Sequence, residues 1–199
     1  NAAAGSQTGL SILHGRHDAT KFRMRPTGII AAVAFAPTSI AGEAALKHID
    51  THSHVIPETI IDAMRAQPDL YKTAIEGERG RYVFKRGKVS FDLALEFYDA
   101  DAKVESMERK GLDISYISPG PQTFFYGLGA DDALTTARLV NDGLAKMVAA
   151  RPDRLRGMAT LPMQHPDAAV TELERVVREY KFKAIEMGTA IGDEELADA

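Results

Sequence analysis

The chain contains no cysteine among its 199 residues, and this absence narrows the chemistry that it can carry. Disulfide bonds and thiolate metal sites are both excluded. A metal ion in this protein would have to be held by histidine and carboxylate side chains, which suit zinc, manganese or iron.

A surplus of positive charge is also missing. The chain has 24 lysine and arginine residues against 28 aspartate and glutamate residues, which gives a formal net charge of −4. No basic surplus therefore points to nucleic acid as the main partner. Hydrophobic residues at 45% and charged residues at 26% are typical of a soluble globular chain that can bury one substantial core.

The apolar run Ile29–Ala36 is too short to cross a bilayer as a helix, so no stable membrane insertion is expected. The run follows Met24 and Arg25 and precedes small residues spaced like a cleavage site, which is the layout of a secretory signal peptide. The alternatives are an apolar leader helix or upstream sequence wrongly joined to the gene. We therefore expect a cytoplasmic protein, or an exported, periplasmic one if the segment from Met24 is a signal peptide.

Composition divides the chain into two parts. Residues 1–45 are interpreted as an N-terminal extension, and residues 1–23, rich in glycine, serine, threonine and scattered charge, are typical of disorder. Residues 46–199 show regular hydrophobic periodicity and are expected to form the folded domain.

Strands and helices alternate along this domain. The predicted strands are 46–55, 112–119, 154–162 and 182–190, and the predicted helices are 57–67, 99–111, 131–152 and 165–181. The polar segment 68–90 is interpreted as a long loop or excursion, and residues 192–199 as the start of another loop or helix.

This alternation predicts an α/β fold with a parallel sheet, either doubly wound or closed as a TIM-type (β/α)8 barrel. No Gly-x-Gly-x-x-Gly follows the first strand, which weakens the dinucleotide-binding version of the doubly wound sheet. A whole barrel needs about 250 residues, and the chain stops directly after its fourth predicted strand. We expect a TIM-type barrel truncated after about four βα units, behind a disordered or signal-like N-terminal extension.

The densest chemistry lies in the stretch HIDTHSHVIPE, residues 48–58. Alternate residues of a strand share a face, so Asp50, His52 and His54 are predicted to point the same way. Burying such polar groups without partners is unfavourable by roughly a few kcal/mol each. A divalent cation held by the two imidazoles would compensate, at the strand end where barrel enzymes place their active sites. A hydrogen-bonded polar strand end is the alternative.

Four stretches resemble the amidohydrolase superfamily in the same order along the chain. They are IDTHSHVIP, KVESMERKGLDISYISP, RLVNDGLAKMVAARPDRLRGMATLPMQHPDAAVTELER and FKAIEMGTAIGDEELADA. The closer similarity is to the amidohydrolase-related branch, which includes aminocarboxymuconate-semialdehyde decarboxylase and the resorcylate decarboxylases. It covers most of residues 47–199, whereas residues 1–46 have no counterpart.

The resemblance implies a metal-dependent barrel enzyme in which His52 and His54 bind one divalent ion, with zinc as the first choice and manganese or iron as alternatives. It also implies a further histidine ligand, an aspartate ligand and a catalytic histidine, all expected beyond Ala199. The full-length protein is expected to take a small-molecule substrate, with a homodimer as one option for its assembly.

Two activities share these ligands. In a hydrolase, metal-activated water attacks a carbonyl or a similar centre; in a non-oxidative decarboxylase, a carbon of the substrate is protonated and CO₂ leaves. The expected protein is a metal-dependent hydrolase or carboxy-lyase of a small carboxylated or cyclic substrate, inactive as this piece alone. A non-catalytic half-barrel or binding module without a complete metal site is the alternative.

Four further residues are candidates, each with a structural alternative. Asp50 is expected either to orient a histidine ligand or to cap a neighbouring backbone. Phe124, Glu186 and His165 are candidates for substrate binding, and Glu186 could touch the metal instead. The alternatives are loop packing for Phe124, a surface or salt-bridged position for Glu186, and helix capping for His165.

The segment 77–90 carries a group of cationic side chains, namely Arg79, Arg81, Lys85, Arg86 and Lys88. A cationic loop over the site could bind a substrate carboxylate, whereas a solvated charged loop is the simpler interpretation. The resembled aminocarboxymuconate enzyme has an arginine after a phenylalanine in this region. The matching position here is Asp92, which argues against that particular substrate.

Overall fold

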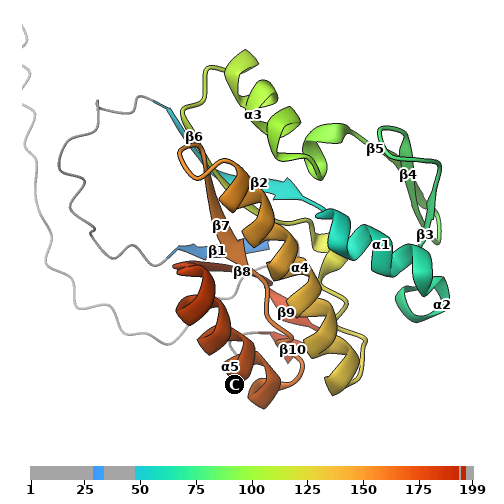
Figure 1. Ribbon diagram of the computed structural model, residues 1–199. Helices are drawn as coiled ribbons and strands as arrows, with labels where there is room; N and C mark the ends of the chain where they lie inside the picture. Colours follow the sequence, from blue (N-terminus) through green and yellow to red (C-terminus); the bar gives the residue numbers. More distant parts are fainter. Residues whose placement is uncertain (1–28, 34–47, 193, 196–199) are drawn as a thin grey trace, which may run out of the picture.

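A five-stranded sheet forms the frame of the molecule and carries the candidate histidines (Figure 1). The computed structural model describes residues 29–33, 48–192 and 194–195. The strand order in the sheet is β1-β8-β7-β6-β2. The strands are β1 Ile29–Val33, β2 Ile49–Val55, β6 Ile114–Pro119, β7 Leu155–Ala159 and β8 Ala184–Gly188.

Four of these strands, β2, β6, β7 and β8, are paired in parallel, each beside its successor in the series. A doubly wound sheet reverses its strand order at a switch point, whereas a barrel adds every strand on the same side. The observed order has no reversal. The protein is therefore an α/β fold with a curled half-barrel sheet of four parallel strands.

Helices lie between successive strands of the chain (Figure 1). They are α1 Glu58–Ala66, α3 Ala100–Arg109, α4 Ala130–Ala150 and α5 Pro166–Arg175, which continues as the π-helical turn η3 Val176–Tyr180. Helices α1, α4 and α5 follow the parallel strands β2, β6 and β7, whereas α3 follows the antiparallel strands within residues 74–93 and leads into β6. Apolar side chains on the inner faces of α1 and α4 are fully buried, among them Ile60, Met64, Val140 and Leu144. The four predicted strands and four predicted helices are confirmed, with ends shifted by a few residues.

The segment 68–90 is structured, so the loop interpretation is wrong, whereas the alternative of an excursion from the parallel sheet agrees with the structure. It contains α2 Pro68–Tyr71, β3 Ala74–Glu76 and β4 Tyr82–Arg86, and with β5 Val89–Leu93 it builds an antiparallel sheet in the order β3-β4-β5. We call this sheet the meander. In β4, Tyr82 and Phe84 are buried while Lys85 is exposed. Only one face of the meander meets the core, and the charged residues on the other face hide this two-residue period in the sequence.

Short elements complete the described chain. The 3₁₀ turns η1 Leu95–Phe97 and η2 Pro121–Thr123 lead into α3 and follow β6. A hairpin of β9 Ala190–Ile191 and β10 Glu194–Glu195 follows β8. The sequence predicted a loop or helix there, and the hairpin corrects that prediction.

Strand β1 is the part of the predicted signal segment that the structure describes. It pairs antiparallel with β8 at the edge of the sheet. The rest of the N-terminal extension predicted for residues 1–45 lies outside the described residues. Among the helices of the described residues, none combines the length and the apolar character needed to cross a membrane.

Candidate metal centre and adjoining cavity

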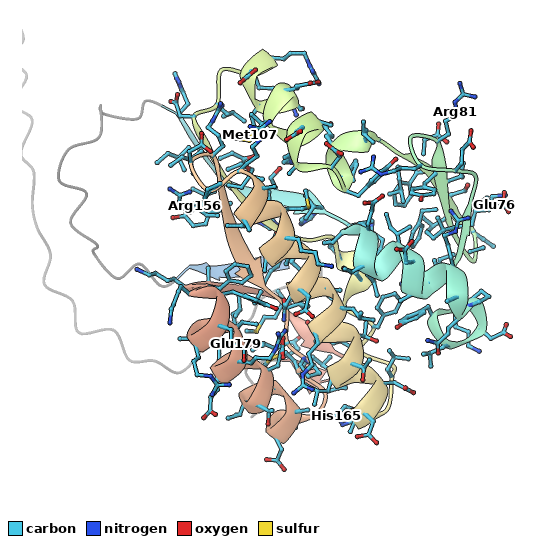
Figure 2. The ribbon with its side chains drawn as sticks, in the orientation of Figure 1. Glu76, Arg81, Met107, Arg156, His165 and Glu179 are labelled. Atoms are coloured by element: carbon cyan, nitrogen blue, oxygen red, sulfur yellow. The ribbon has the colours of Figure 1, made fainter. Side chains whose placement is uncertain are left out.

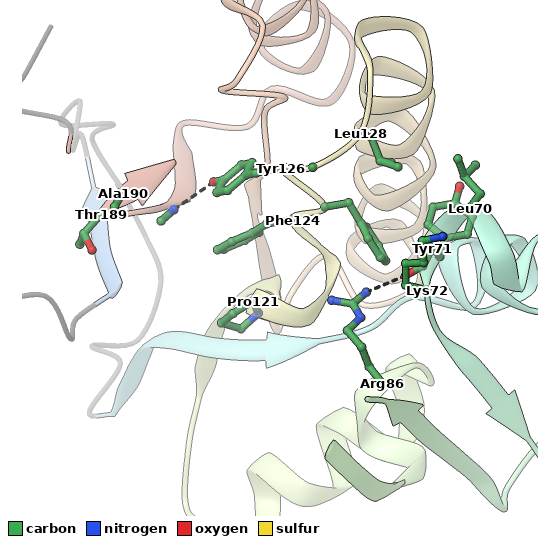
Figure 3. A pocket seen from close by; sticks show the side chains of 13 residues that line it. Leu70, Tyr71, Lys72, Arg86, Pro121, Phe124, Tyr126, Leu128, Thr189 and Ala190 are labelled. Atoms are coloured by element: carbon green, nitrogen blue, oxygen red, sulfur yellow. Dashed lines mark hydrogen bonds between the residues drawn. The ribbon is translucent and has the colours of Figure 1, made fainter. Parts of the chain in front are cut away.

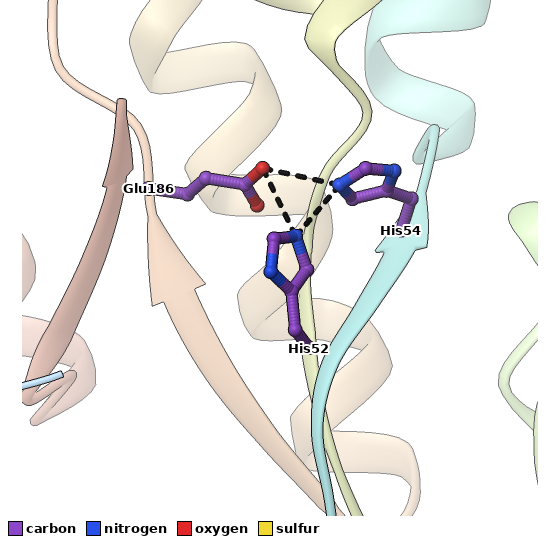
Figure 4. Close-up of side chains that lie close together, drawn as sticks. All are labelled: His52, His54 and Glu186. Atoms are coloured by element: carbon purple, nitrogen blue, oxygen red, sulfur yellow. Dashed lines mark hydrogen bonds and ion pairs between the residues drawn. The ribbon is translucent and has the colours of Figure 1, made fainter. Parts of the chain in front are cut away.

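Two imidazole rings project from the C-terminal half of β2 (Figure 4). His52 and His54 are separated by one residue, so the pleat of the strand sends both side chains to the same face of the sheet. Their Nε2 atoms lie 2.7 Å apart. The side chains are 32% and 33% exposed, so the pair remains open to a ligand.

Strand β8 adds a carboxylate to this pair. Glu186 is completely buried, and its Oε1 lies 3.2 Å from Nε2 of His52 and 3.1 Å from Nε2 of His54. Two strands separate β2 from β8, a distance of about 14 Å in a flat sheet. The side chains meet because the sheet curls, and Figure 4 shows both rings facing the carboxylate. Glu186 is thus not on the surface, and among the described residues its ion-pair contacts are with His52 and His54.

Hydrogen bonds alone cannot satisfy these three atoms. Each contact needs one donor and one acceptor, and each Nε2 has only one of these roles at a time. If both rings donate to Glu186, two N–H groups face each other across 2.7 Å. If one ring accepts instead, its lone pair faces the carboxylate oxygen. Protonating Glu186 adds one hydrogen, but with one imidazole N–H this still gives only two hydrogens for three short contacts.

A divalent cation between the three atoms removes this conflict, because all three then act as lone-pair donors. Two imidazole nitrogens and one carboxylate oxygen are a donor set that zinc, manganese and iron accept. The other carboxylate oxygen of Glu186, Oε2, is buried without a hydrogen-bond partner among the described residues. These residues therefore fit a divalent ion, and the donor set does not single out zinc.

The carboxyl group of Glu186 is held in its ionised form. Burial alone raises the pKa of this carboxyl, but its contacts with the neighbouring histidine side chains, His54 first, outweigh burial, so the pKa lies below its ordinary value. Glu186 therefore presents a carboxylate, the form that binds a cation.

Asp50 uses its carboxylate on the backbone and on a neighbouring strand. Its Oδ1 accepts a hydrogen bond from the amide of His52 at 3.2 Å, and its Oδ2 accepts one from the hydroxyl of Ser115 at 3.2 Å. This arrangement favours the backbone-capping alternative and fixes the peptide that carries the first histidine.

A cavity of about 960 Å³ adjoins the end of β8 (Figure 3). One wall is the loop after β6, where Phe124 stacks on Tyr126 with ring centres 5.4 Å apart. The opposite wall comes from α2 and β4, through Tyr71 and Arg86. Gly188, which also lines the cavity, follows Glu186 by two residues, or about 7 Å along the strand. Phe124 therefore lines a cavity rather than only packing within its loop.

The loop that carries these aromatic rings, residues 124–128, is tied to its surroundings on two sides. The amide of Gly188 donates to the hydroxyl of Tyr126 at 3.0 Å. Nε2 of His165 donates to the carbonyl of Leu128 at 2.9 Å, and the side-chain amide of Gln164 donates to the same carbonyl at 3.3 Å. His165 stands at the N-cap position of α5 (Figure 2), but its side chain makes no capping hydrogen bond. It supports the cavity wall and does not line the cavity itself.

The cationic segment 77–90 divides into paired and unpaired side chains. Arg79 forms ion pairs with Glu58 and Asp99, and Lys85 pairs with Glu76. Arg86 instead lies at the wall of the cavity (Figure 3).

Sequence reasoning raised a cationic loop over the site at residues 77–90, but it predicted no strand there and so did not single out Arg86. The signal was present in the alternation of β4, which places Arg86 on the same side of the strand as the buried Phe84. Tyr71 was equally hidden, since it ends a helix of only four residues.

Comparison with known proteins places residues 49–199 in the amidohydrolase family. The 2-amino-3-carboxymuconate-6-semialdehyde decarboxylase of Dictyostelium discoideum is 30% identical over 112 residues, which are 56% of this chain and 31% of that protein. The gamma-resorcylate decarboxylase of Polaromonas sp. (strain JS666 / ATCC BAA-500) is 41% identical over 85 residues, 41% of this chain and 25% of that protein. The matched regions thus span about a third or less of these curated relatives.

A solved structure shares the fold. The 5-carboxyvanillate decarboxylase LigW from Sphingomonas paucimobilis superposes with a TM-score of 0.51 at 23% sequence identity, over 69% of this chain and 41% of that chain. The likeness supports the half-barrel architecture of the parallel strands and their helices.

Proposed function

The chain belongs to the amidohydrolase family, and on that premise we propose that it carries the metal centre of a metal-dependent decarboxylase for a small aromatic carboxylate. The proposed architecture is the first half of a TIM-type (β/α)8 barrel, with the site at the carboxyl ends of the strands. The observation that carries the proposal is the conflict between His52, His54 and Glu186, which a divalent cation resolves.

The relatives favour loss of CO₂ over hydrolysis as the reaction. Both curated relatives are named decarboxylases, one of a carboxymuconate semialdehyde and one of a resorcylate. The aromatic wall of the cavity suits a planar ring, because Phe124 and Tyr126 present stacked faces to it.

In this mechanism the protein supplies a fixed cluster of ligands beside an apolar cavity. His52 and His54 would hold the ion through their Nε2 atoms, and Glu186 would contribute the single negative charge of the set. When bound, the divalent ion supplies a Lewis acid that polarises an oxygen of the substrate or of water. Phe124 and Tyr126 orient the ring and exclude water from it, and the exposed edges of the imidazoles leave room for a ligand.

The test measures CO₂ release from 2,6-dihydroxybenzoate by the full-length protein, loaded in turn with manganese, zinc or iron(II). The proposal predicts release that requires a metal, stops on chelation, and is lost in His54→Asn. Hydrolysis of a lactone or amide without CO₂ release would contradict the decarboxylase assignment, as would a metal-loaded protein that releases no CO₂ from any hydroxybenzoate.

A further inference from the structure

Arg86 is a half-buried cation without an acidic partner in the part of the chain that the structure describes (Figure 3). Its Nε donates to the hydroxyl of Thr73 at 2.8 Å, and its Nη2 donates to the carbonyl of Tyr71 at 3.5 Å. Both partners are neutral. Burial lowers the pKa of Arg86 from its ordinary value, as expected for a charge that is desolvated and not paired. A guanidinium in this state favours an anion from outside the protein.

Two aromatic rings fix the plane of this guanidinium. Its central carbon lies 4.6 Å from the ring centre of Phe125 and 5.6 Å from that of Phe84. Such stacking leaves the edge of the group free for hydrogen bonds. Nε and one side of Nη2 are engaged, whereas Nη1 has no hydrogen-bond partner among the described residues. The group therefore presents an open donor edge at the wall of the cavity.

The backbone of Phe125 supports this arrangement. Phe125 has a φ of 49°, the left-handed conformation that side chains other than glycine rarely adopt. Its ring contacts Tyr71, with ring centres 4.8 Å apart, and lies under Arg86. Backbone strain of this kind costs roughly 1–3 kcal/mol and persists where surrounding contacts hold it, often at ligand sites.

We propose that Arg86 is the anion-recognising residue of this cavity, and that its ligand is a planar aromatic carboxylate. The carboxylate would meet the Nη1 edge, and the ring would lie against the wall formed by Phe124 and Tyr126. The volume of about 960 Å³ is ample for a single substituted ring. The substrate class rests on the proposed function, but the role of Arg86 rests on its own contacts.

The experiment measures binding calorimetrically on the full-length protein kept free of metal by a chelator. The ligands are 2,6-dihydroxybenzoate and its neutral counterpart 1,3-dihydroxybenzene. The substitution Arg86→Met is expected to weaken binding of the acid by at least about tenfold, because one charge-assisted contact is lost. Binding of the neutral ring is expected to change by less than about twofold. Lys85→Met, which removes the neighbouring exposed cation of β4, is the matched control and should leave both affinities unchanged.

Equal affinity of the acid for Arg86→Met and the unmutated protein would overturn the inference, and so would the absence of saturable acid binding. If Arg86→Met does not fold, titration of the unmutated protein decides. The guanidinium NMR signals of Arg86 must shift in a saturable manner with the acid, and bound acid without such a shift overturns the inference. Acid binding that depends on Arg86 without any CO₂ release would contradict only the proposed function. If the protein releases CO₂ and its affinity for the acid is unchanged in Arg86→Met, only this inference is contradicted.

Discussion

A single buried carboxylate decides what the two histidines can do. Without Glu186, His52 and His54 could share one proton in an ordinary hydrogen bond across 2.7 Å. With Glu186 at 3.1 and 3.2 Å from them, three atoms compete for two hydrogen-bonding roles. At the residue scale, the candidate metal centre thus rests on the count of hydrogen-bond donors and acceptors, which does not depend on the identity of the ion.

The side chain of Asp99 allows a stability prediction at the residue scale. Its carboxylate caps α3 by accepting from the amides of Asp101 and Ala102, and it pairs with Arg79. The hydrogen bond from Ala102, with help from Arg79, lowers the pKa of Asp99 although burial opposes the shift. We expect Asp99→Ala to lower the free energy of unfolding by about 1 kcal/mol, the usual value of an N-cap. Urea denaturation measures this difference.

The pH dependence of this contribution has a defined sign. Because the folded pKa of Asp99 is below the unfolded value, the ionised side chain stabilises the protein above about pH 4 and loses that effect as the pH falls through the lowered pKa. The variant Asp99→Asn keeps an acceptor and removes the charge. Its stability difference from the unmutated protein should therefore shrink in acid, and a difference that stays constant from pH 3 to pH 7 would contradict the account.

Part of the site could be predicted from the sequence, and part could not. The alternation of side chains along a strand was sufficient to place His52 and His54 on one face, because their spacing is a local property of the sequence. The partnership with Glu186 depends on the curl of the sheet across two intervening strands, which no local pattern contains. For Phe124, proximity to the strand end was informative, whereas His165 holds the aromatic loop through a contact 37 residues away in the chain.

At the scale of elements, periodicity identified the four parallel strands and four helices because each has a clear apolar face. Hydrophobic periodicity did not predict the strands of the meander, because they have three to five residues and their outer face is charged. The hairpin after β8 was not predicted for a related reason, since strands of two residues have no measurable period.

The packing of α4 against α5 depends on a buried polar network centred on Glu172. This side chain is fully buried, accepts from Asn141 at 2.7 Å, and pairs with Arg175 at 2.7 Å. The substitution Glu172→Ala removes one acidic partner of Arg175, which keeps Asp142. It also removes one acceptor of Asn141, which keeps the carbonyl of Thr160. We therefore expect a loss of about 1–3 kcal/mol in the free energy of unfolding. Glu174→Ala, an exposed position on the same helix, is the control. A loss below about 1 kcal/mol in thermal or urea denaturation would contradict this role.

At the scale of the whole molecule, one outer surface is unusually apolar. Val170 and Leu173 on α5 and Val177 on η3 are 56%, 38% and 50% exposed, and their spacing places them on one side of this helical segment. Exposed apolar stripes of this kind promote association.

We therefore expect the 199-residue chain to self-associate at micromolar concentration. The double substitution Val170→Lys with Val177→Glu should shift it toward monomer, because both changes place charge within the stripe. Val89→Lys, at an exposed position on β5 of the meander, should leave association unchanged. Sedimentation velocity measures all three proteins, and a monomeric unmutated chain would show that the stripe does not drive contact.

The central claim is that His52, His54 and Glu186 hold one divalent ion, and metal binding at equilibrium tests it most directly. Manganese and zinc are titrated into the chelator-stripped protein, and bound metal per chain is measured by elemental mass spectrometry. The account predicts one bound ion, with affinity weakened at least about tenfold in Glu186→Gln and in His54→Ala, as for the loss of a ligand-shell group. Glu174→Gln should bind as the unmutated protein does. Equal affinity in Glu186→Gln and the unmutated protein would contradict the account.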